Sequence, residues 1–184
     1  KNKINQIWKQ EYPHSLGSFY SAFTEFLGFE PQNDEWKLMG ASAYGNNKKY
    51  YKKLKKTFTI LKEGFELNLK YFNHYQFHRP KLFTENLEKL LGLKSNKPNK
   101  NLTKNYFDLA ASVQKCFEEI YLSLIKQIYK KNKSKNLVLS GGCALNSLAN
   151  GKVVKNTRFK NIFIPPVPDD SGVSIGAAQY VITM

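Results

Sequence analysis

Arginine is scarce in this chain, although the chain as a whole is strongly basic. Of the 29 basic residues among 184, only Arg79 and Arg158 are arginine, and the formal net charge is +15. Proteins that read nucleic-acid bases and phosphates rely on the planar arginine side chain, whereas lysine acts as a solvated point charge. We therefore interpret the lysine-rich stretches 48–56, 94–104 and 126–135 as solvated faces and loops, and expect that nucleic acid is not the partner.

Long apolar runs are also missing. None approaches the ~20 residues that span a membrane, and residues 1–10 lack the apolar segment of a signal peptide. The two cysteines, Cys116 and Cys143, have no metal-ligand spacing, which indicates reduced thiols; a single structural disulfide is the alternative. We expect a cytoplasmic protein without a membrane partner. Because the chain begins with Lys1 rather than methionine, we expect a piece of a longer polypeptide.

Apolar and aromatic residues are plentiful, at 41% and 14% of the chain, which is enough for one domain with a core. Helical spacing of apolar residues begins at Leu16, with Ser15 as the N-cap and Gly28 as the stop. Further helices are predicted at 34–40, 48–56, 82–91 and, longest, 102–131. The long helix carries one buried stripe, made of Leu109, Val113, Phe117, Ile120, Leu124 and Ile128.

Alternating β-prone runs at 57–61 and 65–71 predict a hairpin. The small residues 41–45 indicate a place where the backbone passes close to something else. His74 and His78 are spaced as metal ligands on a helix would be, but their surroundings do not read as helical, so we expect both in a surface loop.

The last third alternates strand and helix. Strands are expected at 137–139 and 161–164, and helices near 144–155 and 173–181. This order predicts a parallel α/β sheet, with the first strand buried.

A glycine turn follows the first of these strands. Gly141 and Gly142 would let a ligand approach the backbone, and the helix start beyond them would attract an anion. Asn146 lies one helical turn further on, where its amide would reach such a ligand. The alternatives are a tight turn without a ligand and an asparagine that caps locally.

An acidic turn follows the second strand, where Asp169 and Asp170 come after a stiff proline-rich loop. Ligand clefts in α/β proteins form at this end of the strands, and a carboxylate there is a hard ligand for a cation. The alternative is that Asp170 only caps the next helix. A functional site requires that the glycine turn and the acidic turn converge on one pocket.

Five blocks of the sequence together point to a known family. They are residues 13–29, 35–45, 108–114, 140–152 and 166–178. In the same order, these blocks resemble the O-carbamoyltransferases of nodulation-factor and antibiotic biosynthesis. In the second block the family typically reads Glu-aromatic-Lys-x-Met-Gly-Leu-Ala-x-Tyr-Gly, and this chain departs from it at Ala41; Cys143 stands where the family often has valine.

The resemblance implies a ribonuclease-H-like α/β fold, of the type shared by actin, sugar kinases and heat-shock chaperones. Residues 1–184 would form a single partial domain, the second half of the ATPase-like domain, with parallel strands, flanking helices and a β-hairpin insertion at about 57–71. This part of the family is similar to the universal tRNA threonylcarbamoyl transferase. The rest of the parent polypeptide, an upstream half-domain and a C-terminal adenylate-forming domain, would be the partner.

The family makes carbamoyl-adenylate from carbamoyl phosphate and ATP, and transfers the carbamoyl group to an acceptor hydroxyl with an iron ion bound in the transferase domain. By motif match, Asp170 would be the metal-ligand aspartate, and Gly141, Gly142 and Asn146 would line the nucleotide. Glu35 and Lys37 would lie near the nucleotide. No catalytic residue is assigned.

Departures from the family limit what this chain would do alone. The two metal histidines of the family lie upstream of the region matched here, so we expect residues 1–184 to be inactive in isolation. One aspartate does not choose between iron, magnesium and manganese, and the acceptor is open among a nodulation factor, an antibiotic and a surface glycan. Two other functions stay open: a tRNA-modifying or nucleic-acid-binding domain, and an ATPase-fold module that only binds partners.

Overall fold

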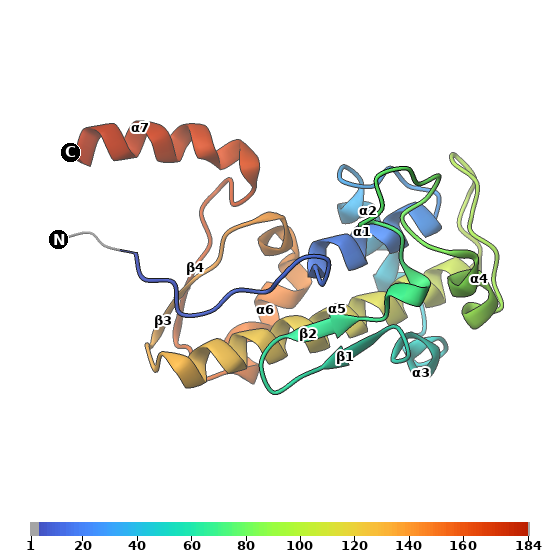
Figure 1. The fold of residues 1–184 in the computed structure, drawn as a ribbon, viewed down its shortest axis with the longest axis horizontal. Helices are drawn as coiled ribbons and strands as arrows, with labels where there is room; N and C mark the ends of the chain where they lie inside the picture. The colour runs from blue at the N-terminus through green and yellow to red at the C-terminus, as the bar shows by residue number, and fades with distance from the viewer. Residues whose placement is uncertain (1–3, 184) are drawn as a thin grey trace.

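The computed structural model describes residues 4–183, and within them the chain is an α/β protein with seven α-helices and two small sheets (Figure 1). The α-helices are α1 (Leu16–Phe26), α2 (Glu35–Ala41), α3 (Tyr51–Leu54), α4 (Glu85–Leu91), α5 (Lys104–Lys131), α6 (Ser147–Asn156) and α7 (Val173–Thr183). The strands are β1 (Phe58–Ile60), β2 (Phe65–Leu67), β3 (Asn136–Val138) and β4 (Asn161–Phe163). Four short 3-10 helices are η1 (Ser42–Tyr44), η2 (Leu69–Tyr71), η3 (Gly142–Leu145) and η4 (Asp170–Gly172).

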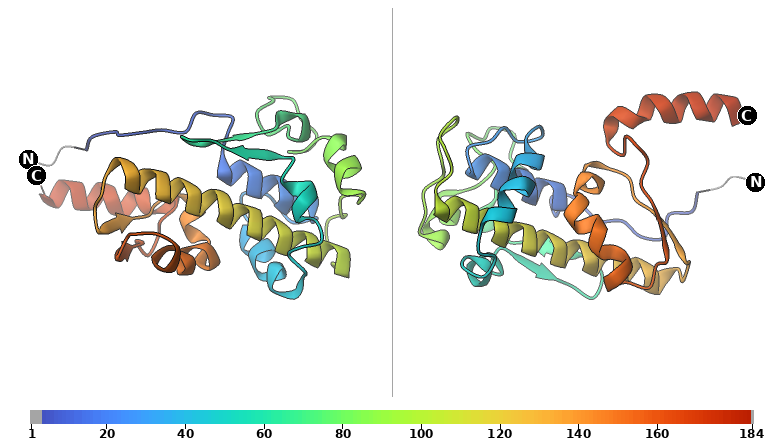
Figure 2. Two further views of the ribbon diagram at one scale, coloured as in Figure 1. Left: turned by 90° about the horizontal axis from the view of Figure 1, so that it is seen from below. Right: turned by 180° about the vertical axis from the view of Figure 1, so that it is seen from behind.

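Helix α5 is the axis of the molecule, and its 28 residues span about 40 Å. Helices α1, α2, α3 and α6 all pack against it, as the views of Figure 2 show. The predicted stripe is confirmed: its first four members are buried, and Leu124 and Ile128 are partly buried against the core. Among the described helices, none combines the length and apolar character that crossing a membrane requires.

The ends of α1 are set as the sequence predicts. The Ser15 hydroxyl accepts a hydrogen bond from the backbone N–H of Ser18, which caps the first turn. Gly28 follows the last turn with φ of +84°, a left-handed conformation that glycine adopts without strain. The helix buries an aromatic face, led by Phe19 and Phe23, against the hairpin and α5.

The predicted hairpin is confirmed, because β1 and β2 pair antiparallel with Phe58 opposite Leu67. The second strand is shorter than expected. The side chain of Asn68 accepts from the backbone N–H of Lys70 and turns the chain into η2.

The close backbone approach predicted at 41–45 is confirmed, and its partner is α5. A methyl group on Gly45 would overlap the backbone carbonyl of Phe107. Next to this contact, the buried carboxylate of Asp108 accepts a hydrogen bond from the Asn46 N–H at 2.7 Å and faces Lys49 at 3.1 Å.

Two helices are shorter than the sequence predicts. The stretch 48–56 is helical only from Tyr51 to Leu54, because Asn46 turns the chain by accepting from the N–H groups of Lys48 and Lys49. At the other end, Thr57 bonds back to the Leu54 carbonyl. The helix expected at 82–91 begins at Glu85, because the Leu82 carbonyl accepts from the Asn73 N–H and Phe83 bridges to Phe72.

The expectation of two surface histidines in one loop is wrong for His74 and right for His78, which is exposed. His74 is buried, with its Nε2 2.7 Å from the carbonyl oxygen of Pro13. Its backbone carbonyl accepts from the Tyr12 hydroxyl. Burial lowers the pKa of His74 and keeps its ring neutral.

The last third forms the predicted strand–helix–strand unit, with β3 and β4 parallel and Leu137 opposite Ile162. The expectation that the first strand is buried is wrong. This sheet has only two strands among residues 4–183, so it has little to cover its faces. Leu137 of β3 is half-buried, and Val138 is 65% exposed. Helix α7 projects from the body in Figure 1 and buries none of its residues.

Candidate functional site

The glycine turn and the acidic turn lie side by side at the carboxyl ends of β3 and β4. Two hydrogen bonds hold them together: the Gly141 N–H donates to the carbonyl oxygen of Pro168 at 2.6 Å, and the Ser140 hydroxyl donates to the same oxygen at 2.9 Å. Pro168 is buried and directly precedes Asp169. The convergence that the sequence required is therefore present.

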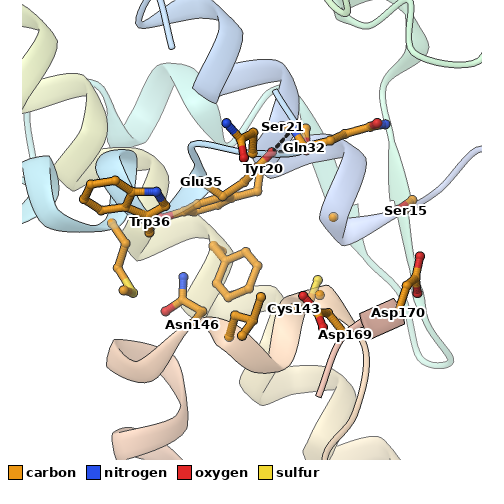
Figure 3. Close-up of a pocket in the computed structure, with 16 residues that line it drawn as sticks. Ser15, Tyr20, Ser21, Gln32, Glu35, Trp36, Cys143, Asn146, Asp169 and Asp170 are labelled. Atoms are coloured by element: carbon orange, nitrogen blue, oxygen red, sulfur yellow. Dashed lines mark hydrogen bonds between the residues drawn. The ribbon is translucent and has the colours of Figure 1, made fainter. Parts of the chain in front are cut away.

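Both turns border one open cavity of about 850 Å³, a volume suited to a nucleotide-sized ligand. In Figure 3, Glu35 and Trp36 of α2 lie across the cavity from Asp169 and Asp170. The lining comes from the start of α1, from α2, from α5 and from the two turns. Its residues are Ser15, Gly17, Tyr20, Ser21, Gln32, Asn33, Glu35, Trp36, Met39, Phe117, Gly142, Cys143, Leu145, Asn146, Asp169 and Asp170.

The charge of the cavity is opposite to that of the chain. Its lining has three carboxylates, on Glu35, Asp169 and Asp170, and no lysine or arginine among the described residues that form it. A phosphate group entering alone would therefore meet negative charge. The cavity is suited to a cation, or to an anion that brings a cation with it.

The acidic turn combines both roles that the sequence left open for it. Asp169 caps η4 by accepting a hydrogen bond from the Ser171 N–H at 3.2 Å. Asp170 is the first residue of η4, is exposed, and borders the cavity. Local capping thus falls to Asp169 and leaves Asp170 at the cavity.

Glu35 and Lys37, which the family resemblance places near a nucleotide, differ in position. One carboxylate oxygen of Glu35 accepts from the Ser21 hydroxyl at 2.5 Å and from the Gln32 N–H at 2.7 Å, at the cavity wall. The ammonium of Lys37 instead pairs with Asp34 at 2.8 Å and lies outside the lining.

Asn146 borders the cavity, but its amide is bonded to the protein interior. Its oxygen accepts from the Ala149 N–H and so caps α6. The same amide exchanges hydrogen bonds with the side chain of Gln114 on α5, at 2.9 and 3.1 Å. In this structure Asn146 thus fixes the glycine turn to α5; a nucleotide contact stays a prediction.

The glycines also differ. Gly141 has φ of +94° and is bonded to the acidic turn, while Gly142 faces the cavity. The segment that follows is a four-residue 3-10 helix, and α6 begins only at Ser147. The helix start next to the glycines is therefore shorter than expected, and its dipole is correspondingly small.

A chain of hydrogen bonds runs from the cavity wall at Tyr20 into the protein interior, and the sequence did not predict it. The Tyr20 hydroxyl donates to Gln114 at 2.7 Å, Gln114 donates to Glu118 at 3.0 Å, and Glu118 pairs with Lys152 of α6. Burial raises the pKa of Tyr20 well above its ordinary range, so its hydroxyl stays a donor. One feature of the sequence could have revealed this network. Gln114 and Glu118 are polar residues four apart on the buried side of a long helix, where polar side chains need hydrogen-bond partners.

The carboxylates have the donor chemistry of a metal site but do not complete one. In residues 4–183, no three histidine, cysteine, aspartate or glutamate side chains are grouped closely enough to hold an ion. Asp170 alone offers too few ligands.

Comparison with known proteins places the chain in a family. A family model described as carbamoyltransferase N-terminus matches residues 1–179. An uncharacterized protein of Synechocystis sp. is 38% identical over 181 residues, 98% of this chain and 29% of that protein. The nodulation protein NolO of Bradyrhizobium diazoefficiens is 29% identical over 168 residues, 91% of this chain and 28% of that protein. The nodulation protein NolNO of Sinorhizobium fredii is 27% identical over 164 residues, 89% of this chain and 22% of that protein. This chain thus spans under a third of the length of these relatives.

Proposed function

This chain belongs to the carbamoyltransferase N-terminus family, and we propose that it is part of an enzyme that carbamoylates a hydroxyl group of a sugar or natural product. The donor in this proposal is carbamoyl-adenylate, made from carbamoyl phosphate and ATP elsewhere in the same polypeptide. The residues described here contribute one side of the transfer site.

One observation carries the proposal: the glycine turn and the acidic turn meet at one cavity, at the ends of two parallel strands. Gly142 and Asp170 both border this cavity of about 850 Å³. Ligands of α/β proteins bind at this end of the strands. The volume suits the adenylate donor together with the acceptor group.

The transfer step moves one carbamoyl group. The acceptor oxygen bonds to the carbamoyl carbon, the bond from that carbon to the adenylate phosphate oxygen breaks, and AMP leaves. The hydroxyl proton must go to a base. The carboxylates of Glu35, Asp169 and Asp170 line the cavity and are able to accept it.

The acidic lining constrains how the nucleotide binds. Three carboxylates repel the adenylate phosphate unless positive charge lies between them. We propose that this charge comes from a divalent ion, iron by resemblance to the family, with Asp170 as one ligand and the others from the rest of the polypeptide. No step of the transfer is assigned to the ion, because its ligand set is incomplete within residues 4–183.

The finer fold assignment, one half of a ribonuclease-H-like domain, is part of the same proposal. Its support is the open architecture of the last third. A parallel pair such as β3 and β4 is normally covered on both faces, yet Val138 and Phe163 are more than 60% exposed. Each strand also has one unpaired edge among the described residues. Further strands of the parent polypeptide would extend these edges, and further helices would cover the faces.

The test uses the longer polypeptide that contains this chain. Carbamoyl phosphate, ATP and a panel of hydroxyl-bearing sugars are supplied, and carbamoylated product and AMP are measured together. Asp170→Asn is expected to lower the transfer rate at least tenfold. Glu85→Gln, which changes an exposed carboxylate on α4, is expected to leave it unchanged. Failure of the unsubstituted polypeptide to form AMP and product would overturn the proposal.

The second candidate function is a tRNA-modifying or nucleic-acid-binding domain, which the net charge of +15 favours. Binding of tRNA that weakens steeply with salt would support it. The acidic lining of the main cavity argues against it. We therefore propose carbamoyl transfer first.

A further inference from the structure

A second groove adjoins the main cavity. It has a volume of about 350 Å³ and shares part of its wall with the cavity. The shared residues are Ser15 and Gly17, at the start of α1, and Cys143 in η3. A ligand lying in the groove would therefore be able to reach the cavity past Gly17.

The segment that precedes α1 lines much of the groove, through Trp8, Gln10, Tyr12 and His14. The chain turns at Tyr12 and Pro13, where the His14 N–H donates to the Glu11 carbonyl at 3.1 Å. The rest of the lining includes Phe65 of β2, Leu124 of α5 and Leu16.

Hydrogen bonds to β2 hold this segment in place. The Gln10 amide donates to the Phe65 carbonyl at 3.1 Å and accepts from the Phe65 N–H at 3.2 Å. Nδ1 of His14 accepts from the Leu67 N–H at 3.0 Å. The Trp8 ring lies against Gly64. The groove is thus built by fixed side chains.

The chemistry of the groove differs from that of the cavity. Its lining within the described chain has no lysine, arginine, aspartate or glutamate, although a quarter of the chain is charged. It offers aromatic rings together with hydroxyl and imidazole groups. The Tyr12 hydroxyl already donates to His74 and the Gln10 amide is bonded to Phe65, so the aromatic side chains are the main surface left to a ligand. An uncharged ligand with an apolar ring face, such as a pyranose, would stack on them.

We propose that this groove is the acceptor subsite and that it binds a neutral saccharide, with the reacting hydroxyl directed past Gly17 into the cavity. The role of the groove as an acceptor subsite rests on the proposed function. The class of ligand is argued from the groove alone.

Gly17 supplies the matched test. It lies in the first turn of α1, and a methyl group added there would contact the Ser15 hydroxyl oxygen at 3.7 Å and the Cys143 sulfur at 3.8 Å, in the shared wall. Larger side chains would close the junction. Gly40 of α2 is the control, because a methyl group added there contacts nothing within 4 Å.

The kinetic experiment uses the longer polypeptide. Gly17→Leu is expected to raise the KM for the saccharide acceptor at least tenfold, with the KM values for ATP and carbamoyl phosphate unchanged. Gly17→Ala is expected to give a smaller change in the same direction, and Gly40→Ala none. An acceptor KM that does not respond to Gly17→Leu would overturn the proposal.

The binding experiment uses the same longer polypeptide and isothermal titration calorimetry, with Trp8→Ala as the groove variant and Gly40→Ala as the control. Neutral saccharides, maltotriose and an N-acetylglucosamine trimer among them, are titrated, and so is glucose 6-phosphate; Trp8→Ala is expected to weaken saccharide binding at least tenfold. Saturation by a neutral saccharide at least tenfold tighter than by glucose 6-phosphate is expected. The absence of saturation by every saccharide would overturn the proposal. Saturation without any carbamoyl transfer by the unsubstituted polypeptide would instead refute the proposed function and leave the ligand class standing.

Discussion

Gln114 and Asn146 hold each other through two amide hydrogen bonds, each donating to the other, at 2.9 and 3.1 Å. The two residues are 32 positions apart, and both are at least 90% buried. This pair joins the middle of α5 to the residue that caps α6. The position of the glycine turn at the cavity therefore depends on a residue of the long helix.

A double-mutant cycle measures this coupling. Asn146→Ala is expected to lower the free energy of unfolding by about 2–4 kcal/mol, because it removes the α6 cap and leaves the Gln114 amide unpaired. The double variant with Gln114→Ala should lose less than the sum, with a coupling of about 1–2 kcal/mol. Urea unfolding provides the measurement. Asn156→Ala, which removes a bond only within α6, is the control, and strictly additive losses would contradict the prediction.

The contact of η1 with α5 leads to a second prediction. Gly45→Ala would push a methyl group into the Phe107 carbonyl, so the two segments must separate. We expect a loss of about 2–4 kcal/mol in the free energy of unfolding, at or above the usual range for overpacking. Gly40→Ala is the matched control and should be neutral or stabilising. Equal thermal midpoints for the two variants would contradict this account.

The acid sensitivity of the fold is expected to depend on Glu88. Burial alone would raise the pKa of its carboxyl, but hydrogen bonds from Ser95 and Lys94 lower it to about 2. A lowered pKa means that the carboxylate stabilises the fold above its ordinary pKa of 4.5, and that this contribution is lost as the pH falls toward 2. Glu88→Gln should therefore cost about 1–3 kcal/mol at pH 7 and little at pH 2.

The measurement is chemical unfolding from pH 2 to pH 7. Glu85→Gln is the control, since Glu85 lies on the same helix but its carboxylate is mostly exposed. A deficit of the Glu88→Gln variant that stays constant from pH 7 to pH 2 would contradict the assignment.

Thiol reactivity provides a fourth prediction. Burial, with a contribution from Glu35, raises the pKa of Cys143 to about 11, and burial raises the pKa of Cys116 to about 12. At pH 8 the thiolate fraction of Cys143 is then on the order of 0.001, so alkylation by iodoacetamide should be slow. Mass spectrometry follows the labelling. Both cysteines should react readily in urea, and rapid labelling of Cys143 in the folded protein would contradict the prediction.

Local patterns were sufficient to predict much of the fold. Ser15 and Gly28 mark the two ends of α1. Both were predictable because an N-cap and a left-handed glycine each act on the adjacent helical turn. The hairpin and α5 follow from periodicity over many residues. The convergence of the two turns follows from the rule that neighbouring parallel strands end at the same edge of a sheet.

The predictions that proved wrong have a common physical cause. In each case the residue contacts a partner outside its own segment of the chain. Leu82 does not join a helix because its carbonyl accepts from the Asn73 N–H, nine residues away. His74 is buried because Pro13, 61 residues earlier, supplies its hydrogen-bond acceptor. The direction of the Asn146 amide is set in the same way by Gln114. Propensity and spacing contain no information about such contacts.

The open sheet of the last third has a practical consequence. Strands β3 and β4 pair only with each other in the part of the chain described, and α7 is apolar yet wholly exposed. Unpaired strand edges and uncovered apolar helices promote association between copies. By itself this chain should therefore be poorly soluble, and cutting before β3 would not cure this, because α6 supplies part of the core through Ala149 and Val153. On the proposal that further strands extend this sheet, co-expression with them should raise the soluble yield.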